Sequence, residues 1–228
     1  MVTQFTKIAP LTAAWLKPLK ALLWLSILAL TQMACTSSLV VESDFPAPLT
    51  KPINVNMGVV YSKELTQYVY KEESDSRDRW IIDMGEAHKN LFQQIFSKLV
   101  AQTAHLKSLD DAKESNLELV LVPSIQEFQY SSPRETKVSI YEVWIKYHMQ
   151  VFETDGTLVA DWIMSAYGKT PSAFLKSNEE AMNQAVIVAL RDLGASLTTG
   201  FAKVPELKAW LDQHNKPKTS PEISLYVR

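Results

Sequence analysis

This 228-residue chain contains a single cysteine and only six glycines, and each scarcity excludes a class of protein. One cysteine cannot form a disulfide within the chain, so packing alone must stabilise the fold. The six glycines are scattered, and none of them belongs to a phosphate-binding loop or to a Gly-x-Ser-x-Gly nucleophile elbow. The sequence therefore lacks the signatures of a phosphate-loop enzyme and of an α/β-hydrolase.

Metal-binding and acid/base signatures are also missing. The four histidines are isolated, and His88 in Glu86-Ala87-His88-Lys89-Asn90 lacks the second histidine four residues later that a helical zinc site requires. The acidic pairs Glu72-Glu73 and Asp110-Asp111 lie in polar stretches, where nothing points to general acid or base catalysis. We therefore expect no metal, no cofactor and no enzymatic activity, and keep an enzyme as an alternative.

Excess positive charge is absent as well. The first 34 residues contain three lysines and no acidic residue, which leaves 20 basic against 25 acidic side chains in the rest, a balance of -5. Nucleic-acid binding needs a clustered basic face that displaces counterions. We expect no nucleic-acid partner.

The N-terminal segment has the pattern of an export signal. Lys7, Lys17 and Lys20 precede an apolar run over residues 21–30. A basic region followed by a short apolar region is typical of a secretory signal, and this run is too short for a membrane span of about 20 residues. The predicted cleavage lies between Ala34 and Cys35.

The residues that end at Cys35 resemble the lipobox of bacterial lipoproteins, although Gln32 stands where that family usually has Leu and Met33 is uncommon in its position. The resemblance implies that Cys35 is acylated and that the mature chain starts there. Three acyl chains would hold the protein permanently on a membrane. By resemblance to the sorting rule of Gram-negative lipoproteins, Thr36 instead of Asp directly after the cysteine implies the outer membrane. An uncleaved N-terminal anchor in the inner membrane is the alternative.

Beyond the leader, the pattern predicts a single domain. Pro46, Pro48 and Pro52 favour extended backbone ahead of it. The alternating Ile223, Leu225 and Val227 in the tail could add to a sheet edge. The predicted segments are a signal peptide (1–34), the lipidated cysteine with a flexible tether (35–52), a single periplasmic α+β domain (53–215) and a loose C-terminal tail (216–228).

Hydrophobic periodicity within the domain predicts strands, two long amphipathic helices and a short third helix. The predicted strands cover residues 53–59, 66–70, 117–129 and the two arms of a hairpin around Asp155-Gly156, and the predicted helices cover 83–101, 177–201 and 205–211. The core order is therefore β-α-β-β-β-α. Because the three central strands have short connections, they are antiparallel, and the two long helices must cover one face. We predict an α+β two-layer sandwich with a mainly antiparallel sheet.

The hairpin sequence Thr154-Asp155-Gly156-Thr157 predicts a two-residue type I′ turn in which Thr154 pairs with Thr157. The resulting register places apolar residues on one face and mostly polar residues on the other. The apolar pairs are Val151–Ala160, Met149–Trp162, Tyr147–Met164 and Ile145–Ala166. A slip of one residue would bury the polar row, so the pattern and the turn select one register.

The same register pairs Trp144 with Tyr167 on the polar face. Two large aromatic side chains there would be exposed and could anchor a protein partner, although aromatic residues in sheets more often serve packing. Trp144 and Tyr167 are the candidate partner-binding residues.

The leader and the order of elements resemble the small α/β-sandwich outer-membrane lipoproteins of Gram-negative bacteria, which include accessory subunits of envelope machines. No motif beyond the lipobox carries this resemblance, so no functional residue transfers from it. It implies a membrane-anchored, non-enzymatic interaction module with an envelope protein partner. The alternative is a binder or carrier of an apolar, lipid-like ligand in a groove between the helices and the sheet.

Overall fold

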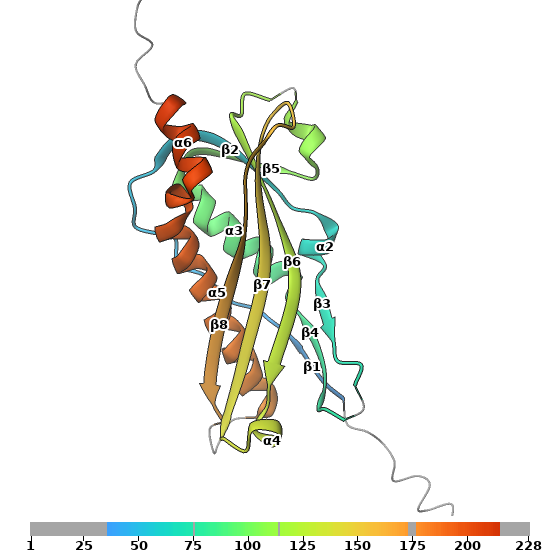
Figure 1. Ribbon diagram of the computed structural model, residues 1–228. Helices are drawn as coiled ribbons and strands as arrows, with labels where there is room; N and C mark the ends of the chain where they lie inside the picture. Colours follow the sequence, from blue (N-terminus) through green and yellow to red (C-terminus); the bar gives the residue numbers. More distant parts are fainter. Residues whose placement is uncertain (1–35, 75, 114, 173–176, 215–228) are drawn as a thin grey trace, which may run out of the picture. The chain divides into compact units, whose positions relative to one another are not determined.

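Two β-sheets and two long helices make up the part of the chain that the computed structural model describes, residues 36–74, 76–113, 115–172 and 177–214 (Figure 1). The described residues from Ser37 onward belong to one compact unit. The large sheet has the strand order β5 (Val100–Leu106), β2 (Ile53–Val60), β6 (Leu119–Ser131), β7 (Ile140–Glu153) and β8 (Leu158–Pro171). The predicted α+β class is confirmed.

The directions of the strands divide the large sheet into two halves. β6, β7 and β8 are antiparallel as predicted, whereas β2 runs parallel to both of its neighbours, β5 and β6. β5 was not predicted, because it continues directly from a helix. The sheet is therefore mixed, and its antiparallel half is the part that the sequence describes correctly.

A second, three-stranded sheet was also not predicted. Its order is β1 (Thr36–Val40), β4 (Arg79–Asp83) and β3 (Val69–Lys71). The strand expected over residues 66–70 is instead the short helix α2 (Lys63–Thr66) followed by β3, and Ser62 caps that helix by accepting a hydrogen bond from the amide of Leu65 at 3.3 Å. Strands of only three to five residues are too short for a clear alternating pattern.

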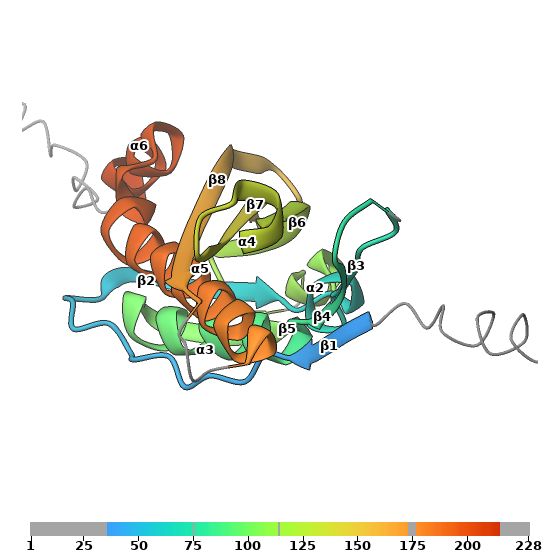
Figure 2. The ribbon, with the colours of Figure 1, turned by 90° about the horizontal axis from the view of Figure 1, so that it is seen from below.

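The two long predicted helices are present as α3 (Gly85–Leu99) and α5 (Asn178–Gly200), and α6 (Pro205–His214) follows. Both long helices lie on one side of the large sheet, where their apolar stripes form the main core (Figure 2). α5 begins after Ser177, whose hydroxyl accepts the amide of Glu180 at 3.1 Å. By length and composition alone α5 could cross a membrane, but half of the relevant window is buried inside the domain.

α5 touches β8 through its backbone at Gly168. A Cβ placed on Gly168 would lie 2.0 Å from the carbonyl oxygen of Ala185 and 2.4 Å from the amide nitrogen of Ala189. Only glycine allows this approach. The small residues Ala185 and Ala189 of α5 form the surface that Gly168 of β8 approaches.

The hairpin between β7 and β8 has the predicted register but a different turn. Glu153 pairs with Thr157 through an amide-to-carbonyl bond of 2.8 Å, so the loop has three residues and ends in Gly156 with φ of 94°. A bulge at Val159 then restores the predicted register from Val151–Ala160 onward. The type I′ prediction was wrong because Asp155 does not adopt positive φ, and a type I turn followed by glycine is the usual three-residue solution.

Pro123 occupies a position where its missing amide hydrogen costs little. β2 pairs with β6 only over Leu119, Val120 and Leu121, so from Pro123 onward β6 has only β7 as a partner in this sheet. A bulge follows between Ile125 and Glu127. Both the position with one partner strand and the nearby bulge are places where a sheet tolerates proline.

The expected flexible tether is structured over residues 36–52. β1 pairs with β4, the amide of Val41 donates to the carbonyl of Asp83 at 2.8 Å, and the side chains of Val41 and Phe45 are buried in the main core. The prolines do enforce extended backbone, but that backbone lies across α3 (Figure 2). We call residues 41–52 the strap. The domain therefore starts close to residue 36 and not at residue 53.

A cluster around Arg77 joins the loop between β3 and β4 to the end of β6. The Arg77 guanidinium donates to Glu72 at 2.9 Å, to both carboxylate oxygens of Glu135 and to the carbonyl oxygen of Tyr130, and it also lies 4.2 Å from the centroid of the Tyr130 ring. Asp78 accepts from Ser132 at 2.8 Å. These contacts tie the two sheets together at this end.

Candidate functional site

One face of β6, β7 and β8 points away from α3 and α5, and we call it the outer face. It carries the pair Trp144 and Tyr167, which the register places directly opposite each other. Their ring centroids are 5.2 Å apart with an interplanar angle of 38°. Trp144 is 36% exposed. The two residues predicted to meet on the polar face therefore do so.

Two hydrogen bonds hold Tyr167 in place. Its hydroxyl donates to Glu142 Oε1 at 2.6 Å, and this bond raises the pKa of Tyr167. Its backbone amide donates to Asp192 Oδ2 on α5 at 3.0 Å, which occupies a donor on the edge strand that would otherwise face solvent. The aromatic pair is thus pre-organised, so little conformational entropy is lost when a partner covers it.

A shallow hollow of about 360 Å³ adjoins Trp144 on the outer face. Glu127 and Lys146 supply opposite charges at directly paired positions. Polar and apolar atoms line it in similar measure, and the lining residues are Glu127, Gln129, Ser131, Trp144, Ile145, Lys146 and Ser165. An aromatic anchor beside mixed polar groups is the usual composition of a protein-binding surface.

His148 and Asp161 form a polar pair further along the same face. His148 Nε2 lies 2.6 Å from Asp161 Oδ1, and Gln150 Nε2 donates to Asp161 Oδ2 at 3.0 Å. These hydrogen bonds, first that of His148, lower the pKa of Asp161. In the described ranges no group of three or more His, Cys, Asp and Glu side chains could hold a metal ion.

His88 is the buried histidine of the core and lies away from the outer face. It is fully buried on α3, and its Nε2 lies 2.8 Å from the hydroxyl oxygen of Tyr147, while its Nδ1 has no hydrogen-bond partner. Burial lowers the pKa of His88 to about 4. The described contact of His88 is therefore a hydrogen bond to Tyr147 within the core.

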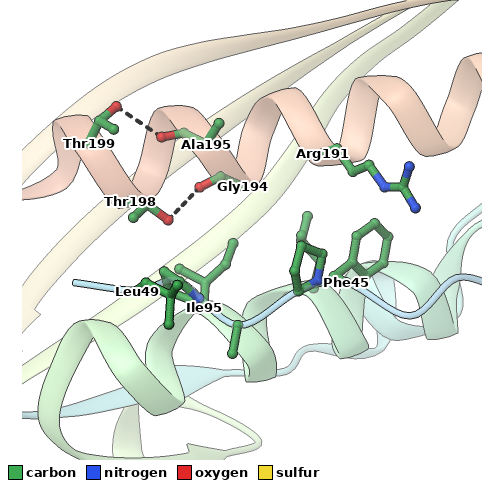
Figure 3. A pocket seen from close by; sticks show the side chains of 12 residues that line it. Phe45, Leu49, Ile95, Arg191, Gly194, Ala195, Thr198 and Thr199 are labelled. Atoms are coloured by element: carbon green, nitrogen blue, oxygen red, sulfur yellow. Dashed lines mark hydrogen bonds between the residues drawn. The ribbon is translucent and has the colours of Figure 1, made fainter.

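A second candidate site lies beneath the strap, and sequence reasoning missed it. The strap, α3 and α5 enclose a groove of about 380 Å³, which we call the strap groove (Figure 3). It lies on the helix layer and not between the helices and the sheet. Its lining residues are Phe45, Pro46, Ala47, Pro48, Leu49, Leu91, Ile95, Arg191, Gly194, Ala195, Thr198 and Thr199. The available signal was the run of small residues Gly194, Ala195 and Ser196 on α5.

Cys35 and Ala34, the predicted lipid-attachment and cleavage residues, lie outside the described residues, as do Gln32 and Met33. The predicted tail over 216–228 lies outside them too. The predictions for these residues stay predictions.

Comparison with known proteins finds similar folds and no similar sequence. No protein-family model matches the chain, and no curated protein matches it significantly. Among solved structures, XCC0632 of Xanthomonas campestris, assigned to the family DUF330, aligns with a TM-score of 0.51 at 9% identity, covering 76% of this chain and 99% of that one. This likeness shows a shared fold.

Two weaker likenesses involve other bacterial proteins. A neuraminyllactose-binding hemagglutinin homologue of Helicobacter pylori aligns with a TM-score of 0.42 at 12% identity, covering 77% of this chain and 100% of that one. A minor lipoprotein of Acinetobacter baumannii aligns with a TM-score of 0.35 at 10% identity, covering 67% and 93%. Neither likeness is strong enough to transfer a function.

Proposed function

We propose that this protein is a membrane-anchored periplasmic lipoprotein that serves as a non-enzymatic accessory module and docks an envelope protein through its outer face. The observation that carries the docking proposal is the Trp144–Tyr167 pair, held in fixed geometry on the sheet face that points away from α3 and α5. The signal and lipobox of the leader support the anchor. The fold shared with bacterial proteins, some named as lipoproteins, is compatible with it.

Aromatic anchors usually dominate the binding energy of protein interfaces. A hot-spot residue contributes about 2 kcal/mol or more, so replacing Trp144 or Tyr167 by Ala should weaken partner binding by about 30-fold each. Neither residue belongs to the buried core. The loss of binding should therefore come without loss of the fold.

Site-specific photo-crosslinking on the outer face tests the docking proposal. A photoreactive amino acid at Lys146 or Ser165, both exposed and adjacent to Trp144, should capture a reproducible envelope protein in intact cells. In the Trp144→Ala, Tyr167→Ala background the captured band should fall at least about tenfold. The matched control is Val138→Ala, an exposed apolar residue in the loop before β7. Equal capture in the double variant and the control would contradict docking through this face.

The anchor is tested separately. Cys35→Ser should abolish acylation and the mass change that accompanies signal cleavage, and the protein should leave the outer-membrane fraction. If Cys35→Ser stays in membranes with unchanged processing, the leader is an uncleaved anchor instead. Because this experiment reads processing and location, its result does not depend on the docking partner.

A further inference from the structure

The strap groove is built from apolar atoms even where its residues are polar. The hydroxyl of Thr198 donates to the carbonyl of Gly194 at 2.7 Å, and that of Thr199 donates to the carbonyl of Ala195 at 2.9 Å (Figure 3). Both hydroxyl hydrogens are therefore used within α5. The walls facing the groove are mainly aliphatic, contributed by the strap, α3 and α5.

The floor of the groove exists because α3 and α5 approach closely at Gly194. A Cβ there would lie 3.2 Å from Leu91 Cδ1 and 3.4 Å from Ile95 Cδ1. The strap lies over this crossing, where Phe45 is buried while Leu49 is fully exposed. A fully exposed leucine at the rim of an apolar groove gains burial when a ligand covers it.

Arg191 supplies the only cation of the groove lining. It lies at one end of the groove, with Leu49 and Thr199 toward the other (Figure 3). In the described part of the chain no ion pair or hydrogen bond engages its guanidinium. From Arg191 to Thr199 the helix rises about 12 Å, which accommodates an extended chain of roughly ten methylenes.

We propose that the strap groove binds the acyl chain of a long-chain fatty-acid anion, with the carboxylate at Arg191 and the tail running toward Leu49. The volume of about 380 Å³ is within the usual range of small-ligand sites. Charge complementarity selects an anionic head, and the aliphatic walls select a hydrocarbon tail. An extended peptide fits less well, because the backbone groups of both helix walls are already paired within the helices.

Photo-labelling of the purified full chain in zwitterionic lipid nanodiscs tests this proposal. The probes are a long-chain fatty acid with a diazirine in its tail and a quaternary alkylammonium of equal length with the same diazirine. Mass spectrometry measures label on residues 45–49 and 191–199, normalised to label elsewhere in the chain. The fatty acid should label the groove at least about fivefold more than the ammonium probe.

Three variants decide the outcome. Leu49→Asp should lower fatty-acid labelling about tenfold, because a carboxylate at the rim disfavours an apolar tail, and Leu49 is already exposed, so the fold stays intact. Arg191→Glu should reverse the preference toward the ammonium probe. The matched control Leu158→Asp, at a half-exposed leucine on β8, should leave labelling unchanged.

Equal labelling by the two probes would overturn the assignment of an anionic head. Groove labelling that neither Leu49→Asp nor Arg191→Glu changes would overturn the site itself. These readouts are independent of the outer face, so a failure of the docking proposal does not affect them.

Discussion

The buried histidine of the core should make this protein sensitive to mild acid. His88 is fully buried beside the ring of Tyr68 and the hydroxyl of Tyr147, and burial lowers its pKa to about 4. In the unfolded chain an ordinary histidine has a pKa of about 6.5. The folded protein therefore resists protonation of His88, whereas the unfolded chain accepts the proton.

The sign and size of the effect follow from these two pKa values. Above pH 6.5 His88 is neutral in both states, so the free energy of unfolding has its full value. As the pH falls from 6.5 toward 4, the unfolded chain binds a proton that the folded protein does not, and the free energy of unfolding decreases. Each pH unit between them costs about 1.4 kcal/mol, so His88 should lower the free energy of unfolding by about 2 kcal/mol between pH 7.5 and pH 5. Below pH 4 the loss levels off at about 3 kcal/mol.

Urea unfolding followed by circular dichroism across this pH range measures the effect. His88→Gln keeps a hydrogen-bonding side chain near Tyr147 but cannot titrate, so its stability should depend on pH less steeply than that of the wild type, by about 2 kcal/mol over the same interval. His214→Gln, on the exposed end of α6, removes a histidine without touching the core. If His88→Gln keeps the full wild-type dependence, the reasoning from burial is refuted.

Further predictions concern packing and the contacts between the sheets. Gly168→Ala should destabilise the domain by about 3 kcal/mol or more in urea unfolding, because the new Cβ would lie 2.0 Å from the carbonyl oxygen of Ala185; a loss below about 1 kcal/mol would contradict that contact. Gly156→Ala, which meets no atom within 4 Å but has φ of 94°, should cost only about 1 kcal/mol in the same assay. Arg77→Ala should accelerate amide hydrogen exchange over residues 72–79 and 131–137. Arg77→Lys should exchange almost as fast, because lysine cannot make the paired contacts to Glu135. Exchange rates equal to those of the wild type would show that the Arg77 cluster does not stabilise these segments.

The antiparallel half of the sheet could be predicted because its information is local. The alternation along β7 and β8 gives the same register as the turn, so the pairing of Trp144 with Tyr167 follows from sequence. The turn itself was mispredicted, yet the bulge at Val159 compensates for the extra loop residue. Burial of one face therefore determines the register more strongly than the turn type does.

The missed elements depend on contacts between distant segments. β5 has no clear alternation and becomes a strand by pairing with β2 in parallel, which no local pattern shows. The strap contains isolated apolar residues, Val41 and Phe45, whose burial in the main core depends on segments far along the chain. The partners that fix Tyr167, Glu142 and Asp192, are equally distant in sequence.

The position of the strap sets how far the domain can travel from whatever holds residue 36. Tension at that residue must first separate β1 from β4 and then withdraw Val41 and Phe45, before it reaches β2 in the large sheet. Releasing residues 36–52 frees about 55–60 Å of extended chain. While residues 36–52 are packed on the domain, they keep it close to the point that holds residue 36. When tension releases them, the distance that the domain can reach increases while the large sheet stays folded.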